Sequence, residues 1–339
     1  MVTSEHTPRV AVIGCGYWGR NLVRNFHALG ALRAVADPAS SGRSCAAQLA
    51  PGIAITAEVE RVIADPAIDA VVVATPAVTH FELGRRCLAA GKDLFVEKPM
   101  ALTLADAADL VALAAREQRI LQVGHVLEYH PAVAVLKEWI AGGRLGAVRR
   151  LHSHRLNFGR VRTEEDALWN VAPHDFALML RLLGRLPREV SCFASHALGT
   201  PRADFSIAML RFDGGIDAHV FAGWLHPTKE QRLVLVGERG VAVFDDAAPL
   251  AQKLTFFDQH VDFRDGEPEL FKGNASCAPL PADEPLRLEC AAFLEAIVTR
   301  RAPLTDGPSG LRVVALLEAC RRSTENGGRI ERLPALPPT

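Results

Sequence analysis

Two hydrophobic periodicities alternate along the first 125 residues of the chain. Short runs that are apolar on both faces are typical of strands buried in a parallel sheet, and they occur at residues 9–13 (RVAVI), 68–76, 92–99 and 119–125. Between them, apolar residues recur at helical spacing in residues 20–30, 78–91 and 102–118. This alternation of strands and helices predicts an α/β domain with a doubly wound parallel sheet over residues 1–123.

The pattern changes after about residue 124. One helical segment (PAVAVLKEWIAGG) is followed by strand-like runs in close succession, separated by glycine-containing turns such as Asp213-Gly214-Gly215. Strands that follow one another in this way predict an antiparallel sheet. Two more helices are expected around residues 285–300 and 307–325. We therefore expect residues 124–339 to form a second, α+β domain.

The sequence GCGYWG follows the first predicted strand and precedes a helix. Its glycines, Gly14, Gly16 and Gly19, have the GxGxxG spacing of a dinucleotide-binding turn. The first glycine permits the tight turn, the second lets a pyrophosphate approach, and the third lets helix and strand pack closely. The positive end of the following helix then faces the phosphates. The motif and its context predict a Rossmann domain.

A further strand is predicted at residues 31–38 (ALRAVADP), and Asp37 ends it, 18 residues after Gly19. A carboxylate there accepts hydrogen bonds from the adenosine ribose and repels a 2′-phosphate, so the sequence favours NAD over NADP. Two nearby cations, Arg33 and Arg43, weaken that preference slightly.

Composition and charge narrow the partners. The chain has 339 residues, of which 49% are hydrophobic and 23% charged, and its net charge is -1. A nearly neutral protein has no general attraction to nucleic acid or to anionic lipid, and neither is expected as a partner. Seven scattered cysteines without a CxxC pair are typical of reduced thiols, which favours a cytoplasmic location.

A nicotinamide enzyme has to manage one proton as the hydride leaves, and two residues are candidates for that task. Lys98 lies at a predicted strand end inside VEKPM, although a solvated turn lysine would look the same. His174 begins an apolar helix in APHD. The adjacent Asp175 is expected to be only a helix-start carboxylate.

His152 and His154 share one face of a predicted strand, a spacing that can bind metal. No third ligand is evident in the sequence. We therefore expect no metal site.

Several separate stretches together resemble the Gfo/Idh/MocA oxidoreductase family: GCGYWG, ATP with His80 four residues past Pro76, VEKPM, and APHD before an apolar helix. The resemblance implies an open antiparallel sheet in the second domain and a homodimer or homotetramer. It also implies that Lys98 contacts cofactor and substrate and that His174 is the general acid/base. Cofactor contacts are implied for a larger set: Gly14, Gly16, Tyr17, Trp18, Gly19, Asp37, Thr75, Pro76, His80, Glu97 and Lys98.

Two further stretches, RLNFGRVRTEEDALWNVAPHD and GWLHPTKEQRLVLVGERG, are similar to one branch of that family. Members of this branch oxidise C3 of UDP-N-acetylglucosamine or of its uronic acid, and an aminotransferase then takes the ketone. Oxidation of a free sugar or inositol, and an NAD-bound sensor without turnover, stay open as alternatives. Substrate contacts are expected from arginine and amide side chains near His174, namely Arg155, Asn157, Arg160, Arg162, Asn170 and His174 itself.

Position 170 departs from the family pattern. Many members carry an aspartate four residues before the histidine, and this chain has Asn170. An amide can orient an imidazole ring but cannot neutralise its charge. Either His174 works without a carboxylate partner or Lys98 takes a larger share of the proton transfer.

Overall fold

The computed structural model describes residues 7–159, 161–334 and 336, and it divides into two compact units. Unit 1 contains the chain up to Tyr129 together with Glu284–Val314. Unit 2 contains His130–Asp283 and the described residues from Ala315 to 336. This differs from the expected division near residue 124, because a later helix returns to the first unit.

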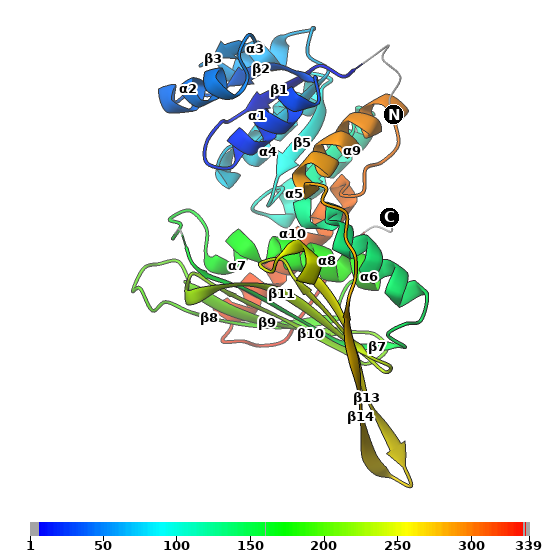
Figure 1. Cartoon of the computed structure of the whole chain (residues 1–339). Helices are drawn as coiled ribbons and strands as arrows, with labels where there is room; N and C mark the ends of the chain where they lie inside the picture. Colours follow the sequence, from blue (N-terminus) through cyan, green and yellow to red (C-terminus); the bar gives the residue numbers. More distant parts are fainter. Residues whose placement is uncertain (1–6, 160, 335, 337–339) are drawn as a thin grey trace. The chain divides into compact units, whose positions relative to one another are not determined.

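Among the described residues, unit 1 is built on a six-stranded parallel sheet in the order β3-β2-β1-β4-β5-β6. Its strands are β1 (Val10–Ile13), β2 (Leu32–Ala36), β3 (Ala54–Thr56), β4 (Ala70–Val73), β5 (Asp93–Glu97) and β6 (Leu121–Gly124). Its helices are α1 (Gly19–Ala28), α2 (Ser40–Leu49), α3 (Val59–Ala64), η1 (Ala77–Thr79), α4 (His80–Ala89), α5 (Leu104–Arg116), η2 (Val126–Tyr129) and α9 (Pro285–Thr299). The predicted Rossmann domain is confirmed (Figure 1).

Helix α9 belongs to unit 1 because its apolar face completes the core of that unit. Phe293 packs edge-on against Phe26 of α1 and Phe95 of β5, with ring centroids 6.3 Å and 5.6 Å away. All three rings are fully buried. We had expected residues 285–300 in the second domain, but their helix packs in the core of unit 1. Sequence order does not show which core an amphipathic helix joins.

Unit 2 contains a nine-stranded sheet within the described residues, in the order β14-β13-β12-β11-β7-β10-β9-β8-β15. The strands are β7 (Val148–Phe158), β8 (Glu189–Ser195), β9 (Phe205–Phe212), β10 (Ile216–Gly223), β11 (Leu225–Gly237), β12 (Val241–Asp245), β13 (Leu254–Arg264), β14 (Glu267–Cys277) and β15 (Glu331–Arg332). The sheet is mostly antiparallel, as expected, but β7 and β10 pair in parallel. Helices and two further strands separate β7 from β10, and this long crossover makes parallel pairing possible.

Helices α6 (Pro131–Ala141), α7 (Ala167–Val171) and α8 (Pro173–Leu183) cover one face of this sheet (Figure 1). A short turn, η3 (Leu250–Gln252), follows β12, and α10 (Gly307–Glu325) begins in unit 1 and ends in unit 2. Strand β7 alternates as predicted: Leu151 and Ser153 are buried toward the helices, whereas His152 and His154 are half-exposed.

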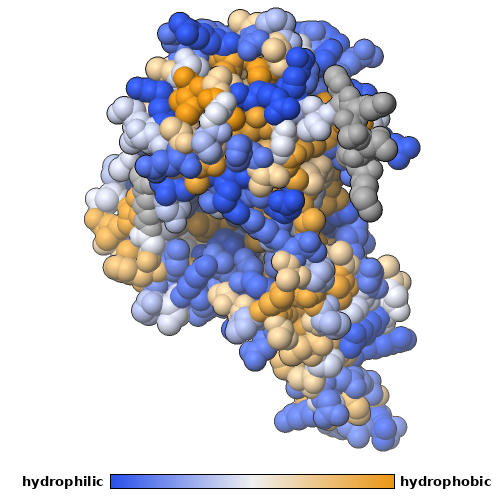
Figure 2. All heavy atoms as spheres, turned by 45° about the horizontal axis from the view of Figure 1, so that its top comes forward, coloured by the Kyte–Doolittle hydropathy of each residue, from blue (hydrophilic) through white to orange (hydrophobic). Residues whose placement is uncertain are grey.

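Strands β13 and β14, which the sequence patterns did not predict, pair as a long hairpin. Their surface carries apolar and polar side chains together (Figure 2). Four large apolar residues are exposed on it: Val261, Phe263, Leu270 and Phe271. No helix in the described part of the chain is long and apolar enough to cross a membrane.

Candidate active site

The glycine-rich turn after β1 has the geometry that a dinucleotide requires. Gly14 has φ +95°, and a Cβ there would lie 2.7 Å from the carbonyl oxygen of Ala74. A Cβ on Gly19 would lie 2.1 Å from the carbonyl oxygen of Gly14, so α1 packs directly on the turn. Above Gly16 nothing lies within 4 Å of a Cβ position. The turn is thus tight beneath and open above, which fits the approach of a pyrophosphate.

Asp37 closes the same turn from the end of β2. Its carboxylate accepts hydrogen bonds from the backbone N–H groups of Cys15, at 2.7 Å, and Ala39, at 2.8 Å. Only 7% of the residue is exposed. Arg43, whose charge would attract a 2′-phosphate, donates instead to the carbonyl oxygens of Asp37 and Pro38. The fixed negative charge at this end of the sheet therefore fits NAD better than NADP.

His80 holds two turns together at the carboxyl edge of the sheet. Its Nδ1 lies 2.8 Å from the carbonyl oxygen of Pro99 and its Nε2 lies 2.8 Å from that of Thr75. The residue is 1% exposed. Any effect of His80 on a cofactor would therefore pass through the Thr75-Pro76 and Lys98-Pro99 turns that it fixes.

Glu97 and Lys98 stand at the end of β5. The Glu97 carboxylate accepts a hydrogen bond from the indole N–H of Trp18, 2.5 Å away, and one from the backbone N–H of Lys98 at 3.2 Å. Burial raises the pKa of Glu97 to about 7. Burial, with the nearby charge of Lys98, lowers the pKa of His125 to about 3. Lys98 is half-buried.

In unit 2, α8 begins with Pro173 at its first turn and places Asp175 wholly inside the protein. The Asp175 carboxylate accepts two hydrogen bonds from Arg155, at 2.7 Å and 3.0 Å, and one from the Ser153 hydroxyl at 2.5 Å. His174, one residue earlier, is half-buried. Asp175 is thus a helix-start carboxylate, as expected, and also the anchor of α8 on β7.

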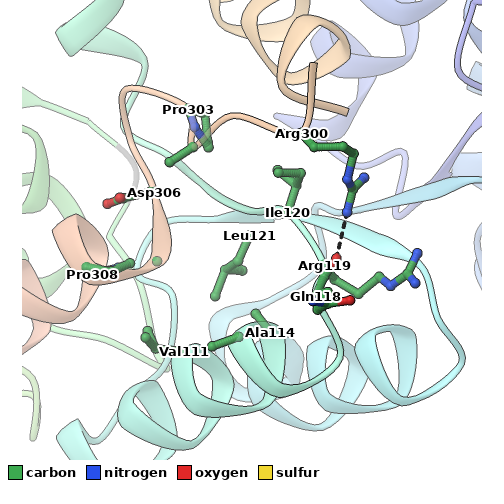
Figure 3. Close-up of a pocket in the computed structure, with 13 residues that line it drawn as sticks. Val111, Ala114, Gln118, Arg119, Ile120, Leu121, Arg300, Pro303, Asp306 and Pro308 are labelled. Atoms are coloured by element: carbon green, nitrogen blue, oxygen red, sulfur yellow. Dashed lines mark hydrogen bonds between the residues drawn. The ribbon is translucent and has the colours of Figure 1, made fainter. Parts of the chain in front are cut away.

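A cavity of about 680 Å³ in unit 1 lies at the amino end of β6, whereas Glu97 and Lys98 stand at the carboxyl end of β5 (Figure 3). It adjoins Ile120 and Leu121 at the amino end of β6, where Arg300 donates to the carbonyl oxygen of Gln118 at 2.7 Å. Dinucleotides bind beyond the carboxyl ends of such strands. This cavity is therefore not the cofactor site.

Family comparisons agree with this geometry. A family described as an oxidoreductase family with an NAD-binding Rossmann fold (GFO/IDH/MocA) matches residues 8–125. The GFO/IDH/MocA C-terminal domain matches residues 133–243. The chain belongs to the Gfo/Idh/MocA oxidoreductase family. It is an NAD-binding oxidoreductase.

Three relatives show the range within this family. UDP-N-acetylglucosamine 3-dehydrogenase from Acidithiobacillus ferrooxidans is 28% identical, with 94% of this chain and 97% of that protein aligned. Its solved structure superposes with a TM-score of 0.81 over 94% of this chain and 97% of that one, at 26% identity. Inositol 2-dehydrogenase 1 from Saccharopolyspora erythraea is also 28% identical, over 96% of each chain. Levoglucosan dehydrogenase in complex with NADH and levoglucosan shares the fold, with a TM-score of 0.83, 19% identity, and 97% and 100% coverage.

Asn170 is the residue that departs from the expected family pattern, and the structure shows how its amide is held. Its Nδ2 donates to the Glu165 carboxylate at 2.7 Å, and its Oδ1 accepts from the Trp224 indole N–H at 3.3 Å. Backbone bonds run from α7 through Ala172 into α8. Asn170 and His174 therefore lie on one helical face, four residues apart. Position 170 has no carboxylate of its own, but its amide binds the carboxylate of Glu165.

The other expected substrate contacts have different outcomes. Arg155 is 8% exposed and its guanidinium is bound to Asp175, so its placement does not support contact with a diphosphate. Asn157 and Arg162 are half-buried. Arg160 lies outside the described residues.

Sequence reasoning missed the buried partners of Asp175. A usable signal was present, because Ser153 and Arg155 share a strand face with Leu151, and polar groups on an apolar face need a buried partner.

The predicted cofactor residues and Lys98 belong to unit 1, whereas His174 and Asn170 belong to unit 2.

His152 and His154 meet a third histidine from β10. The ring of His152 stacks on that of His219, with centroids 5.2 Å apart, and His154 lies 3.1 Å from the Glu230 carboxylate. Across the residues that the structure describes, no group of three or more His, Cys, Asp or Glu could hold a metal ion.

Proposed function

We propose that this protein oxidises the C3 hydroxyl of a UDP-sugar, either UDP-N-acetylglucosamine or its uronic acid, to a 3-keto sugar with NAD. The observation that carries the proposal is the likeness to the Acidithiobacillus ferrooxidans 3-dehydrogenase along nearly the whole chain, both in sequence and in fold. Asp37 supports NAD as the cofactor, because its carboxylate opposes a 2′-phosphate.

The chain's own residues would manage the proton. NAD, when bound, supplies the hydride acceptor. Lys98 is held at the end of β5, where its cation can stabilise the oxygen that loses a proton. His174, at the start of α8, is the proposed general base, with Asn170 on its helical face. Replacing Lys98 or His174 by alanine should each lower kcat by ~10²–10⁴.

A second candidate is oxidation of inositol or of a free sugar. An inositol 2-dehydrogenase matches this chain at the same 28% identity, over 96% of its length. A third candidate, an NAD-bound sensor without turnover, is opposed by the presence of both Lys98 and His174.

One assay separates the candidates. Purified protein is incubated with NAD and, in turn, UDP-N-acetylglucosamine, its uronic acid, myo-inositol and glucose, with an aminotransferase and glutamate added to remove ketone. NADH absorbance with either nucleotide sugar supports the proposal. Turnover of inositol alone would refute the proposal of UDP-sugar oxidation. No turnover of any substrate would favour the NAD-bound sensor. We further propose that the protein acts upstream of a sugar aminotransferase, which the dependence of NADH yield on the added aminotransferase would support.

A further inference from the structure

One side-chain hydrogen bond in unit 1 links the glycine-rich turn after β1 to the end of β5. Trp18 belongs to the turn after β1, and Glu97 ends β5, with β4 lying between those two strands. The indole N–H of Trp18 donates to the Glu97 carboxylate across that gap. The order of strands reverses between β1 and β4, and dinucleotides bind at such a crevice. The contact therefore spans the place where the cofactor binds.

Glu97 is the fixed partner of this contact. It is 6% exposed, and its second oxygen accepts the backbone N–H of Lys98 at 3.2 Å. The backbone of Gly124, at the end of β6, lies so close to the same carboxylate that a Cβ there would be 2.8 Å from Oε2. Trp18, in contrast, is 38% exposed on a glycine-rich turn. A change in this contact therefore moves the turn and not the strand end.

Burial and nearby charges shift the pKa values of the ionisable groups around Glu97, and Glu97 is the group whose pKa lies near neutrality. Burial raises the pKa of Glu97 to about 7, while Trp18 and the Lys98 cation oppose that rise. His125, beyond β6, stays neutral because burial lowers its pKa to about 3. On α9, burial and the charges of Glu97 and of Glu128 (η2) raise the pKa of Glu289 well above its usual range. Glu289 is thus a second buried carboxyl with a raised pKa beside Glu97.

We propose that Glu97 is a positioning residue for NAD: its ionised carboxylate holds the Trp18 indole and keeps the glycine-rich turn in the shape that receives the pyrophosphate. A hydrogen bond to a carboxylate is roughly twice as strong as one between neutral groups, so protonation of Glu97 loosens the turn. A loosened turn has to be ordered when the cofactor binds, which costs affinity. The inference rests on NAD binding by unit 1 and is independent of the sugar that the protein oxidises.

The test is the dissociation constant of NAD, measured by calorimetry from about pH 6 to about pH 8.5 with the whole chain. ADP-ribose, which lacks the nicotinamide ring, is measured in parallel. Both ligands should bind roughly five- to tenfold more weakly at the acidic end. Glu97→Gln and Trp18→Phe should bind both ligands weakly at every pH, with no slope. Glu289→Gln, a second buried carboxyl, should keep the wild-type slope.

Each opposite result overturns the inference. Tighter binding by Trp18→Phe would show that the indole competes with the cofactor. A pH slope for NAD without one for ADP-ribose would place the titrating group at the nicotinamide end. A slope that survives in Trp18→Phe, or that disappears in Glu289→Gln, removes Glu97 from the role. Thermal midpoints confirm that each variant is folded, and Trp18→Phe alone decides the question if Glu97→Gln does not fold. If neither ligand binds the wild type at any pH, NAD binding itself fails together with the inference.

Discussion

Arg155 and Asp175 form a buried, two-bonded ion pair that joins strand β7 to the first turn of α8. The two bonds are 2.7 Å and 3.0 Å long, and the Asp175 side chain has no exposed surface. Because His174 precedes Asp175 directly, this pair fixes the backbone that carries the proposed catalytic histidine. The segment APHD thus has two different tasks on adjacent residues.

Replacing Asp175 by asparagine should destabilise the protein by about 3–5 kcal/mol, because the buried Arg155 would then lose the carboxylate that it binds directly. Urea unfolding of the whole chain measures this. The matched control is Asp245→Asn, which breaks the more exposed pair with Arg232 and should cost less than about 1 kcal/mol. Equal losses in the two variants would contradict the structural role of the buried pair.

Replacing Gly14 by alanine should abolish NAD binding. A methyl group there would meet the Ala74 carbonyl oxygen, and the residue has φ +95°. Gly30 is the matched control, because it also has a positive φ, +72°, but nothing lies within 4 Å of its Cβ position. Gly30→Ala should lose only stability, about 1 kcal/mol or somewhat more, and keep its affinity for NAD. Calorimetric titration separates the two outcomes, and intact binding by Gly14→Ala would refute the assignment of the turn.

Replacing Asn170 by aspartate should move the pH profile of kcat/KM. A carboxylate on the same helical face favours the imidazolium form of His174, so the acidic limb should shift upward by about one pH unit or more. Glu165→Gln is the control, since glutamine can still accept the Asn170 hydrogen bond without the charge. A profile unchanged in Asn170→Asp would shift the proton transfer to Lys98.

Stability should fall in acid partly because of His125. Burial lowers the pKa of His125 in the folded protein to about 3, from an ordinary 6.5. Between these two values the imidazole is protonated in the unfolded chain and neutral in the folded protein. Above pH 6.5 the neutral His125 costs no stability, and the free energy of unfolding falls as the pH drops from 6.5 toward about 3. His125→Leu should remove about 1.4 kcal/mol per pH unit from the slope between roughly pH 6 and pH 4. The raised pKa values of Glu97 and Glu289 act in the opposite direction in both proteins, and they cancel in the comparison. An identical slope in the variant would contradict this account.

The β13–β14 hairpin should take part in assembly to a homodimer or homotetramer. Phe263 is 72% exposed and Leu270 69% exposed, and a two-stranded ribbon cannot bury them itself. Changing both to glutamate should reduce the mass measured by light scattering, while Arg264→Ala on the same hairpin should not. A wild-type protein that is already a monomer would refute the prediction.

Much of unit 1 could be predicted from residue order because its signals are local. Glycine spacing in GCGYWG, apolar runs such as Ala70–Val73 and the periodicity of Leu104–Arg116 each report a nearby backbone requirement. The polar segment Ser40–Leu49 gave no such signal, and α2 was missed there. The helix start in APHD made His174 a candidate, and family likeness added the role of general acid/base.

The order of amino acids by itself therefore predicted the fold class and the cofactor and suggested the candidate site residues. Folding alone decided which core α9 enters, that β7 and β10 run parallel, and that Arg155 binds Asp175. It also decided that Trp18 and Glu97, both expected to touch the cofactor, bind each other. These are contacts between residues 20 to nearly 270 positions apart. No local pattern encodes such contacts, because they depend on the packing of whole elements and on burial of the charges that the packing brings together.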